Sequence, residues 1–483
     1  MKRAGLSILA ADPSERMSEL ISSVARHIGT PELFLLILGG IFFLIYSRFV
    51  QYRYFGHAIQ ILRGKYDDPN DPGQLSAYEA LSTALASTVG MGNIAGVATA
   101  ISIGGPGALF WMWVTAFVGM STNFFTSALS VMYRGKDSAG NLQGGPMYVI
   151  REALGKNWIP LAWLFSCCCM IGCLPIFQAN QLTQVIIDVG ITDEAWKSAT
   201  FFLGSWELNT AKFVIGTILM VVSGIVIIGG IQRIGSWAGK MVPLMIVVYF
   251  VSVVLILLLN FDRVPQYFLM IITDAFSAEH YRGNPALGGL LGGLIVTGVQ
   301  RASFSNEAGI GTAPLALGAS RSKEPIREGL VSMLSPAIDT LLVCTLTALA
   351  ILVTDVWKTP DVSGVSLTTM AFESSLGLTG KLLLLISAFF FAITSLFSYS
   401  YYGNKSISFM AGVNSGRWYD YFYLSTIVMG AVVSMQVVTS IIDIAYALMA
   451  VPTMLSGFAL APKVMQEANR YFARLREESA SGK

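Results

Sequence analysis

The chain is interrupted twice where its surroundings are apolar. It reads Thr88-Val89-Gly90-Met91-Gly92-Asn93-Ile94-Ala95-Gly96 in the first half and Ser303-Phe304-Ser305-Asn306-Glu307-Ala308-Gly309-Ile310-Gly311-Thr312 in the second. Irregular backbone inside a bilayer is tolerated only where protein or a water-filled cavity satisfies its polar groups. Two such breaks, one in each half, are typical of a secondary transporter built from repeats, with its substrate site at the breaks. The sequence therefore predicts both an architecture and the place of the site.

The composition predicts an integral membrane protein. The 483 residues are 54% hydrophobic and 12% charged, whereas soluble domains carry roughly 25% charged residues. The apolar residues gather in runs that approach the ~20 residues needed to cross ~30 Å of hydrocarbon. A net charge of only +2 gives no reason to expect a nucleic-acid partner. No cluster of nucleophile, metal ligands or acid–base groups points to an enzyme.

We expect an all-α protein with about eleven membrane-spanning helices. One extra N-terminal helix precedes ten that we number as core helices 1 to 10, and core helices 1 and 6 carry the two breaks. The expected spans lie near 33–50, 75–103, 107–132, 158–187, 211–230, 238–260, 288–318, 329–354, 382–403, 420–438 and 441–461. Because each repeat holds five spans, an odd number, the second repeat must be inverted relative to the first.

This reading divides the chain into five segments. They are an N-terminal surface segment 1–32, the extra helix 33–50, the first repeat 75–260, the second repeat 288–461 and a tail 462–483. Most loop lysines and arginines share one side of the membrane with the tail, so the positive-inside rule places the C-terminus in the cytoplasm. Eleven spans then place the N-terminus outside. Four basic residues before the first span run against that orientation: Lys2, Arg3, Arg16 and Arg26.

The first break suits a zwitterionic substrate. A helix broken inside the membrane exposes backbone N–H groups, which attract anions, and C=O groups, which attract cations. Gly90 and Gly92 permit the unwinding, amides near Gly92 and Asn93 could hold a carboxylate, and the Asn93 side chain is a further donor. The competing interpretation is a glycine hinge for close helix packing. We favour the substrate site because a second break exists.

Core helix 8 offers ligands for a sodium ion. Phe391, Thr394 and Ser395 share one helix face, and two hydroxyls with a freed carbonyl are hard oxygen ligands. The carbonyls of Ala86 and Val89, just before the first break, could complete the set. The alternative is that both hydroxyls bond back to carbonyls of their own helix.

Other polar residues within the spans leave two interpretations open. Gln178 and Gln181 of core helix 3 share a face and serve either as substrate contacts or as interhelical hydrogen bonds. Ionisable residues inside a membrane are functional candidates, but mutual pairing is the structural alternative for Arg301 and Glu307, which flank the second break. The roles of Asp339 and Asp443 are equally open.

At these motifs the chain resembles the alanine or glycine:cation symporter family, also called sodium:alanine symporters. The matching stretches are Val89-Gly90-Met91-Gly92-Asn93-Ile94-Ala95-Gly96-Val97-Ala98, Gly104-Gly105-Pro106-Gly107-Ala108-Leu109-Phe110-Trp111-Met112-Trp113-Val114, Gly144-Gly145-Pro146-Met147-Tyr148, Gln178-Ala179-Asn180, Phe304-Ser305-Asn306-Glu307-Ala308-Gly309 and Ser400-Tyr401-Tyr402-Gly403. They run from core helix 1 to core helix 8, so the resemblance covers most of the chain.

The resemblance implies a leucine-transporter-like fold and a bacterial cytoplasmic membrane. It implies uptake of alanine, glycine or D-alanine coupled to sodium, in some members to protons. It places the substrate against Asn93, Gln178, Phe304 and Ser395, and sodium between core helices 1 and 8. The chain departs from the family's usual pattern at Leu174-Pro175, where Gly-Asn is common, at Tyr399, where many members have a pocket tryptophan, and at Thr126, where a glutamate is frequent. The first two departures bear on substrate range.

The leading hypothesis is sodium-driven symport of a small neutral amino acid by alternating access. Sodium is then a co-transported ion, with no organic cofactor, and the partners are the amino acid and the lipid bilayer. We expect a monomer and leave an oligomer open. One alternative is proton coupling that requires Glu307 or Asp339. Another is a transporter-like sensor or a channel, although no ring of charged residues suggests a pore.

Overall fold

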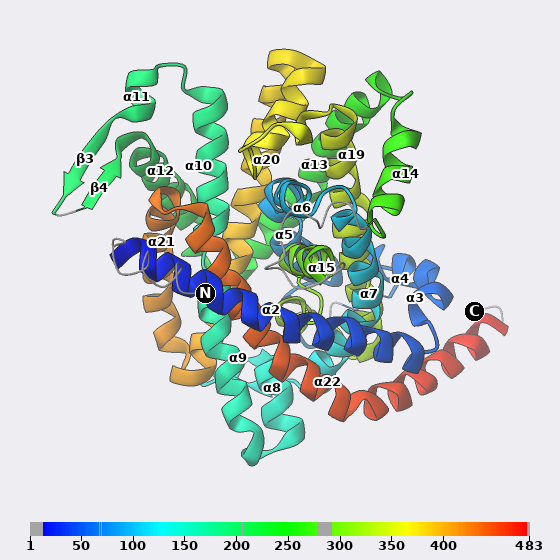
Figure 1. The fold of residues 1–483 in the computed structure, drawn as a ribbon. Coiled ribbons are helices and arrows are strands. Elements are labelled where there is room, and N and C mark those ends of the chain that lie inside the picture. The colour runs from blue at the N-terminus through cyan, green and yellow to red at the C-terminus, as the bar shows by residue number, and fades with distance from the viewer. Residues whose placement is uncertain (1–12, 67, 69, 205, 278–291, 481–483) are drawn as a thin grey trace, which may run out of the picture.

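The computed structural model describes residues 13–66, 68, 70–204, 206–277 and 292–480. Within them the chain is nearly all helical, which confirms the predicted class (Figure 1). The helices are α2 (Pro13–Tyr46), α3 (Val50–Arg53), α4 (Phe55–Leu62), α5 (Ala77–Thr88), η1 (Gly92–Gly96), α6 (Val97–Gly104), α7 (Ala108–Met132), α8 (Pro146–Val149), η2 (Ile150–Leu154), η3 (Lys156–Trp158), α9 (Ile159–Gly172), α10 (Ile176–Gly190), α11 (Glu194–Ser198), α12 (Thr210–Ile227), α13 (Gly230–Leu259), α14 (Val264–Asp274), α15 (Gly292–Asn306), α16 (Ala313–Leu317), α17 (Pro325–Ser332), α18 (Leu334–Pro336), η6 (Ala337–Cys344), α19 (Thr345–Val353), η7 (Val356–Lys358), α20 (Val365–Ala411), α21 (Val413–Val432) and α22 (Met435–Ala480).

In the described part of the chain, two short antiparallel hairpins lie between helices, one between α7 and α8 and one between α11 and α12. Strand β1 (Gly135–Lys136) pairs with β2 (Leu142–Gln143), and β3 (Thr200–Leu203) pairs with β4 (Trp206–Asn209). Both lie in segments that the sequence places between spans, so neither disturbs the helical bundle.

In the described part of the chain, eight continuous helical stretches are long and apolar enough to cross a membrane, and a ninth span results if α5 and the η1–α6 segment count as one bent pair. The two other expected spans correspond to α15–α16, which is interrupted, and to α21. The first half of α21 is polar, with Arg417 and Asp420 among its residues. The structure is consistent with eleven spans without fixing that number.

The first break is a change of helix type as well as direction. Helix α5 begins at a capping box, in which the side chains of Ser76 and Glu79 each accept a backbone N–H of the other residue. It ends at Thr88, and a π-helical turn, η1, follows after Gly90 and Met91. The helices on either side of the break are bent by 43°.

The second break is a stretch of non-helical backbone between α15 and α16. Three of its residues have left-handed backbone: Glu307 (φ 55°), Gly309 (φ 85°) and Gly311 (φ 105°). Glycine adopts this conformation without steric cost, whereas Glu307 must be held in it by its surroundings. Core helices 1 and 6 are therefore discontinuous where the sequence predicts.

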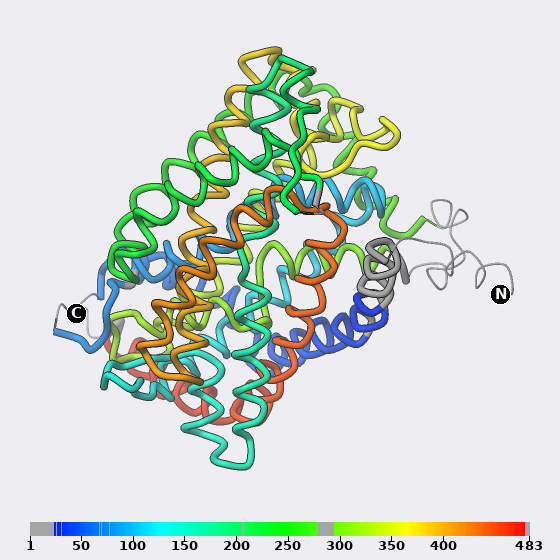
Figure 2. Tube along the Cα trace, turned by 90° about the vertical axis from the view of Figure 1, so that its left-hand side faces the viewer, coloured from blue at the N-terminus to red at the C-terminus, as the bar shows by residue number. Residues whose placement is uncertain are grey.

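The broken helices lie inside the bundle. Figure 1 shows α15 near the centre of the molecule, with α5, α6 and α7 around it. Figures 1 and 2 both place the N-terminal helix α2 beside α22, where Phe43 stacks on Phe458 at 5.1 Å between ring centroids. Figure 2 also shows α13 running alongside α20. A central position of this kind gives the irregular backbone protein partners in place of lipid.

Several helices run past the segment borders expected from the sequence. Helix α2 continues without interruption across the border between 32 and 33, although Pro31 lies inside it, and residues 1–12 lie outside the described part. Helix α22 continues through the expected tail, with Pro452 and Pro462 inside it. Helix α20 comprises two helices that meet at Gly377, where the backbone is non-helical. The division into five segments stays a prediction.

Candidate functional site

At the first break, side-chain amides already hold the freed backbone. The amide N–H of Gly90 donates to Asn93 Oδ1 at 2.8 Å, and that of Met91 donates to Gln178 Oε1 at 3.1 Å. Asn93 and Gln178 are 0% and 2% exposed. The structure thus brings together three of the predicted substrate residues, one of them from α10. Here the donors bond to protein, so a substrate carboxylate would have to replace some of these bonds.

Asn93 also links the first break to the second half of the chain. Its Nδ2 donates to Asp339 Oδ1 at 2.6 Å and to the Asp339 carbonyl at 3.2 Å. The other carboxylate oxygen accepts from Ser305 at 2.9 Å and from Thr340 at 2.7 Å. A fully buried carboxylate thereby gathers donors from η1, α15 and η6. The sequence shows Asp339 only as an ionisable residue within a span; the π-helical η6 that directs it to Asn93 leaves no sequence signal.

Both hydroxyls of the predicted sodium site bond back to carbonyls of α20, and the structure does not test the ion. Thr394 Oγ1 donates to Phe390 O at 2.8 Å, and Ser395 Oγ donates to Phe391 O at 2.9 Å, as helical hydroxyls commonly do. Ser395 also faces the break, because a Cβ built on Gly90 would come within 2.3 Å of Ser395 Oγ. A hydroxyl that donates to a carbonyl still offers lone pairs to a cation, so ion binding is compatible with these bonds.

The remaining predicted sodium ligands lie on the two helices already described. Ala86 and Val89 are at the end of α5, and Phe391 and Thr394 are in α20. Ala86, Val89 and Phe391 are fully buried. Thr394 turns partly away from the break, since its Oγ1 lies 3.5 Å from Met245 Sδ of α13. The assignment of a sodium ion to this set stays a prediction.

Phe304 covers the first break with its ring. A Cβ on Gly92 would lie 3.5 Å from that ring, so glycine at this position permits the close approach. Phe177 packs edge-on against Phe304 at 4.6 Å, and Tyr446 lies beyond it at 6.1 Å. Phe304 therefore lies next to Gly92, and its contact with the substrate stays a prediction.

Tyr399 belongs to a buried cluster around Glu307. Its hydroxyl donates to Glu307 Oε1 at 2.6 Å, Tyr446 donates to the same oxygen at 3.3 Å and to the Tyr399 hydroxyl at 3.1 Å, and Ser87 donates to Glu307 Oε2 at 3.4 Å. These bonds keep the left-handed Glu307 in place at the second break. Nothing in the sequence singled out Ser87 or Tyr446 for this role.

Two of the open alternatives are decided by geometry. Arg301 pairs with Asp443 of α22 at 2.5 Å instead of with Glu307. Gln181 donates to Asn180 Oδ1 at 2.8 Å and accepts from the amide of Val365 at 3.2 Å. Gln181 is thus an interhelical tie, whereas Gln178 reaches the break.

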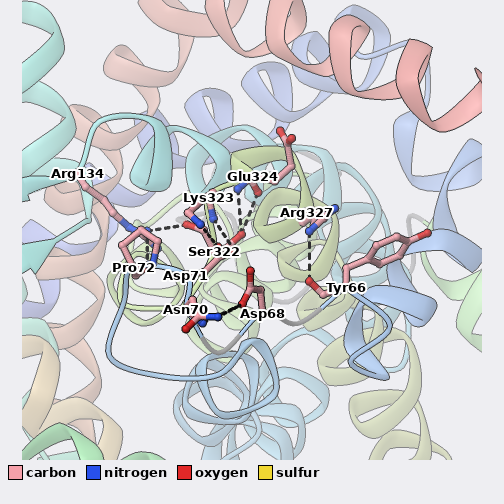
Figure 3. A network of polar contacts seen from close by, with 10 residues as sticks. All are labelled: Tyr66, Asp68, Asn70, Asp71, Pro72, Arg134, Ser322, Lys323, Glu324 and Arg327. Atoms are coloured by element: carbon pink, nitrogen blue, oxygen red, sulfur yellow. Dashed lines mark hydrogen bonds and ion pairs between the residues drawn. The ribbon is translucent and has the colours of Figure 1, made fainter. Parts of the chain in front are cut away.

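A polar network lies on the side of the molecule that the charge pattern predicts to face the cytoplasm (Figure 3). Arg134 donates to four backbone carbonyls, of which one precedes α5 and three follow α16 in the chain. They are those of Pro72 at 3.2 Å, Gly318 at 2.9 Å, Ser320 at 2.5 Å and Ser322 at 2.9 Å. Lys323 pairs with Asp71 at 2.7 Å, and this hydrogen bond raises the pKa of Lys323. The network ties the start of core helix 1 to the end of core helix 6.

Comparison with known proteins shows the family to which the chain belongs. The model of the sodium:alanine symporter family matches residues 14–482. The chain belongs to the sodium:alanine symporter family. It is 33% identical to the sodium/alanine symporter AgcS of Methanococcus maripaludis over 470 residues, 95% of this chain and 98% of that protein. It is 31% identical to the probable sodium/glutamine symporter GlnT of Bacillus subtilis, over 95% of this chain and 91% of that one.

The fold has a counterpart among solved structures. The structure of MhsT in complex with L-phenylalanine superposes with a TM-score of 0.56, over 82% of this chain and 93% of that one, at 12% sequence identity. The likeness supports the leucine-transporter-like fold alone. The family match itself supports a multi-pass membrane transporter of the cation-coupled amino-acid class, since the members of this family are transporters.

Proposed function

We propose that this member of the family takes up a small neutral amino acid, such as alanine or glycine in L or D form, together with sodium by alternating access. The observation that carries the proposal is the position of Asn93. This side chain bonds to Gly90 at the first break and to Asp339 from the second half, while Ser395 of α20 faces the same glycine. Elements from both halves of the chain thus meet at one point, as expected for a substrate site between two repeats.

The substrate would lie against Gly90, Gly92, Asn93, Gln178, Phe304, Ser395 and Tyr399. Its carboxylate would bind the amides of the break, where N–H groups favour negative charge. Burial of Phe304 and the small residues around it favour a short side chain. Since Tyr399 carries a hydroxyl into this region and one relative is a probable glutamine symporter, glutamine belongs among the substrates tested.

Sodium would lie between α5 and α20, with the carbonyls of Ala86, Val89 and Phe391 and the hydroxyls of Thr394 and Ser395 as ligands. All are hard oxygen donors. Sodium would brace core helix 1 against core helix 8, and the substrate would then complete the site. The transporter would work as a monomer in the bacterial cytoplasmic membrane, with its C-terminus in the cytoplasm and its N-terminus outside.

Proton coupling is the second candidate, and one observation favours it. Glu307 and Asp339 are 1% and 0% exposed, and their hydrogen bonds in the described part of the chain come from uncharged groups. A carboxylate buried without a counter-ion is costly unless a proton or a cation neutralises it.

Uptake of labelled alanine into proteoliposomes tests both candidates. We expect accumulation under an inward sodium gradient and none when choline replaces sodium at constant pH. Accumulation driven by an inward pH gradient in choline would replace sodium by protons as the coupling ion. Failure with alanine, glycine and glutamine under both gradients would contradict the proposed function.

A further inference from the structure

A cavity of about 210 Å³ lies away from the central site. It opens between the β1–β2 hairpin, the start of α13, the last turns of α20 and the start of α21, on the side that the charge pattern places in the cytoplasm. A water molecule takes up about 30 Å³ in the liquid, so the cavity has room for a small solute in place of several waters. Its wall includes Lys405, Tyr401, Asn404, Asp137 and Asp420.

Lys405 brings a buried amino group to this cavity, and the neighbouring wall residue Asp137 does not form an ion pair with it. The residue is 4% exposed, and its Nζ donates to the carbonyl of Leu315 at 2.9 Å and to the hydroxyl of Tyr401 at 3.1 Å. An ammonium has three donors, and both of these acceptors are neutral. Within the described residues no carboxylate lies within ion-pair distance of Lys405. A buried ammonium in this setting is stabilised by any anion that enters the cavity.

The two carboxylates of the wall differ in how fully they are engaged. Asp137 accepts the backbone N–H groups of Ala139 and Asn141, each at 2.9 Å, and the side chain of Gln143 at 3.1 Å, which fixes the hairpin turn. Asp420 accepts a hydrogen bond from Asn404 through Oδ1 at 2.9 Å. Among the described residues no donor bonds to Oδ2 of Asp420, which can therefore accept from a ligand. The cavity thus carries a cation and an anion that are not paired with each other.

We infer that this cavity is a second amino-acid site, in which Lys405 binds the carboxylate and Asp420 the ammonium of the transported substrate before its release to the cytoplasm. The inference rests on the proposed function, because it assigns the ligand from the substrate class. Lys405 follows Ser395 by ten residues on α20, which is about 15 Å along a helix that rises about 1.5 Å per residue. The second site therefore lies beyond the central one along a shared helix.

A purely structural role for Lys405 makes a different prediction. Its hydrogen bond to the Leu315 carbonyl connects α20 to α16. Loss of this connection would change the KM equally for transport from either face of the membrane. Loss of a release site is expected to raise the KM for transport that starts from the cytoplasmic face and to leave the KM for transport from the outer face nearly unchanged. Sidedness is therefore the readout that separates the two roles.

The experiment compares Lys405→Gln with wild type in right-side-out and inside-out membrane vesicles, with labelled alanine as the probe and sodium on the side of entry. We expect the KM measured from the cytoplasmic face to rise about tenfold, as for loss of a charge-assisted hydrogen bond, and the KM from the outer face to stay within about twofold. Lys405→Arg should retain most of the affinity. Lys463→Gln removes an exposed lysine from α22 on the same expected side and should change neither KM.

Equal rises on both faces, or no change on either, would overturn the inference while the proposed function stands. Absence of sodium-dependent transport by wild type would instead remove the proposed function, and the second site with it. Asp420→Asn is measured in the same way and should also raise only the cytoplasmic-face KM. It decides the question if Lys405→Gln does not reach the membrane.

Discussion

At the scale of single residues, the site depends on amides that serve two partners at once. Asn93 accepts from Gly90 and donates twice to Asp339, to Oδ1 and to the carbonyl. A carboxylate has no donor for these bonds and a hydroxyl has only one. The sequence singled out Asn93 because an amide beside a glycine break has no obvious structural use, whereas for Gln178 it left a substrate contact and an interhelical hydrogen bond equally open. It could not predict Asp339 as the partner, since that contact joins residues far apart in the chain.

Gln178 and Gln181 of α10 test this distinction directly. Gln178→Ala removes the side chain that accepts from the Met91 amide at the break and, with it, a proposed contact to the charged substrate. Loss of a hydrogen bond to a charged group costs about 1.5–3 kcal/mol. We expect the KM for alanine to rise about tenfold or more. Gln181→Ala removes bonds to Asn180 and Val365 and should lower the melting temperature while the KM stays within about twofold. Similar KM values in both variants would refute a substrate role for Gln178.

At the scale of elements, the helix breaks follow from local chemistry only in part. Gly309 and Gly311 indicate left-handed backbone, which other residues avoid. The second break could therefore be predicted from the sequence. The left-handed Glu307 could not, because tyrosines on α20 and α22 hold it there. The π-helical turns η1 and η6 also leave no clear trace in composition; such turns are frequent at functional sites.

The contact between the first break and α20 can be tested at Gly90. In Gly90→Ala the new Cβ would come within 2.3 Å of Ser395 Oγ, so the serine must move away from the predicted ion site. We expect the sodium concentration for half-maximal uptake to rise about tenfold, since displacing one ligand costs roughly as much as losing a hydrogen bond to a charged group. Gly56→Ala is the matched control because a Cβ there meets nothing within 4 Å. An unchanged sodium dependence in Gly90→Ala would separate Ser395 from the ion.

At the scale of the whole molecule, apolar runs and two breaks were enough to predict the fold class. They could not predict how far α2, α20 and α22 extend beyond a single span, because helix ends outside the bilayer depend on tertiary packing more than on hydropathy. The network around Arg134 was equally hidden. Its acceptors are backbone carbonyls, which have no sequence signature.

The central claim is that one site at the two breaks couples sodium to the amino acid. Coupling is reciprocal, so sodium must tighten substrate binding by the factor by which substrate tightens sodium binding. The most direct measurement is the Kd of purified protein for labelled alanine across a sodium series at constant ionic strength. It is made for wild type, for Thr394→Ala/Ser395→Ala, and for Ser387→Ala, another buried α20 hydroxyl that bonds back to its own helix.

We expect sodium to lower the Kd about tenfold or more in wild type and in Ser387→Ala, within the range typical of coupled sites, and to have no effect in the double variant. A Kd that ignores sodium in wild type, or full sodium dependence in the double variant, would contradict the account.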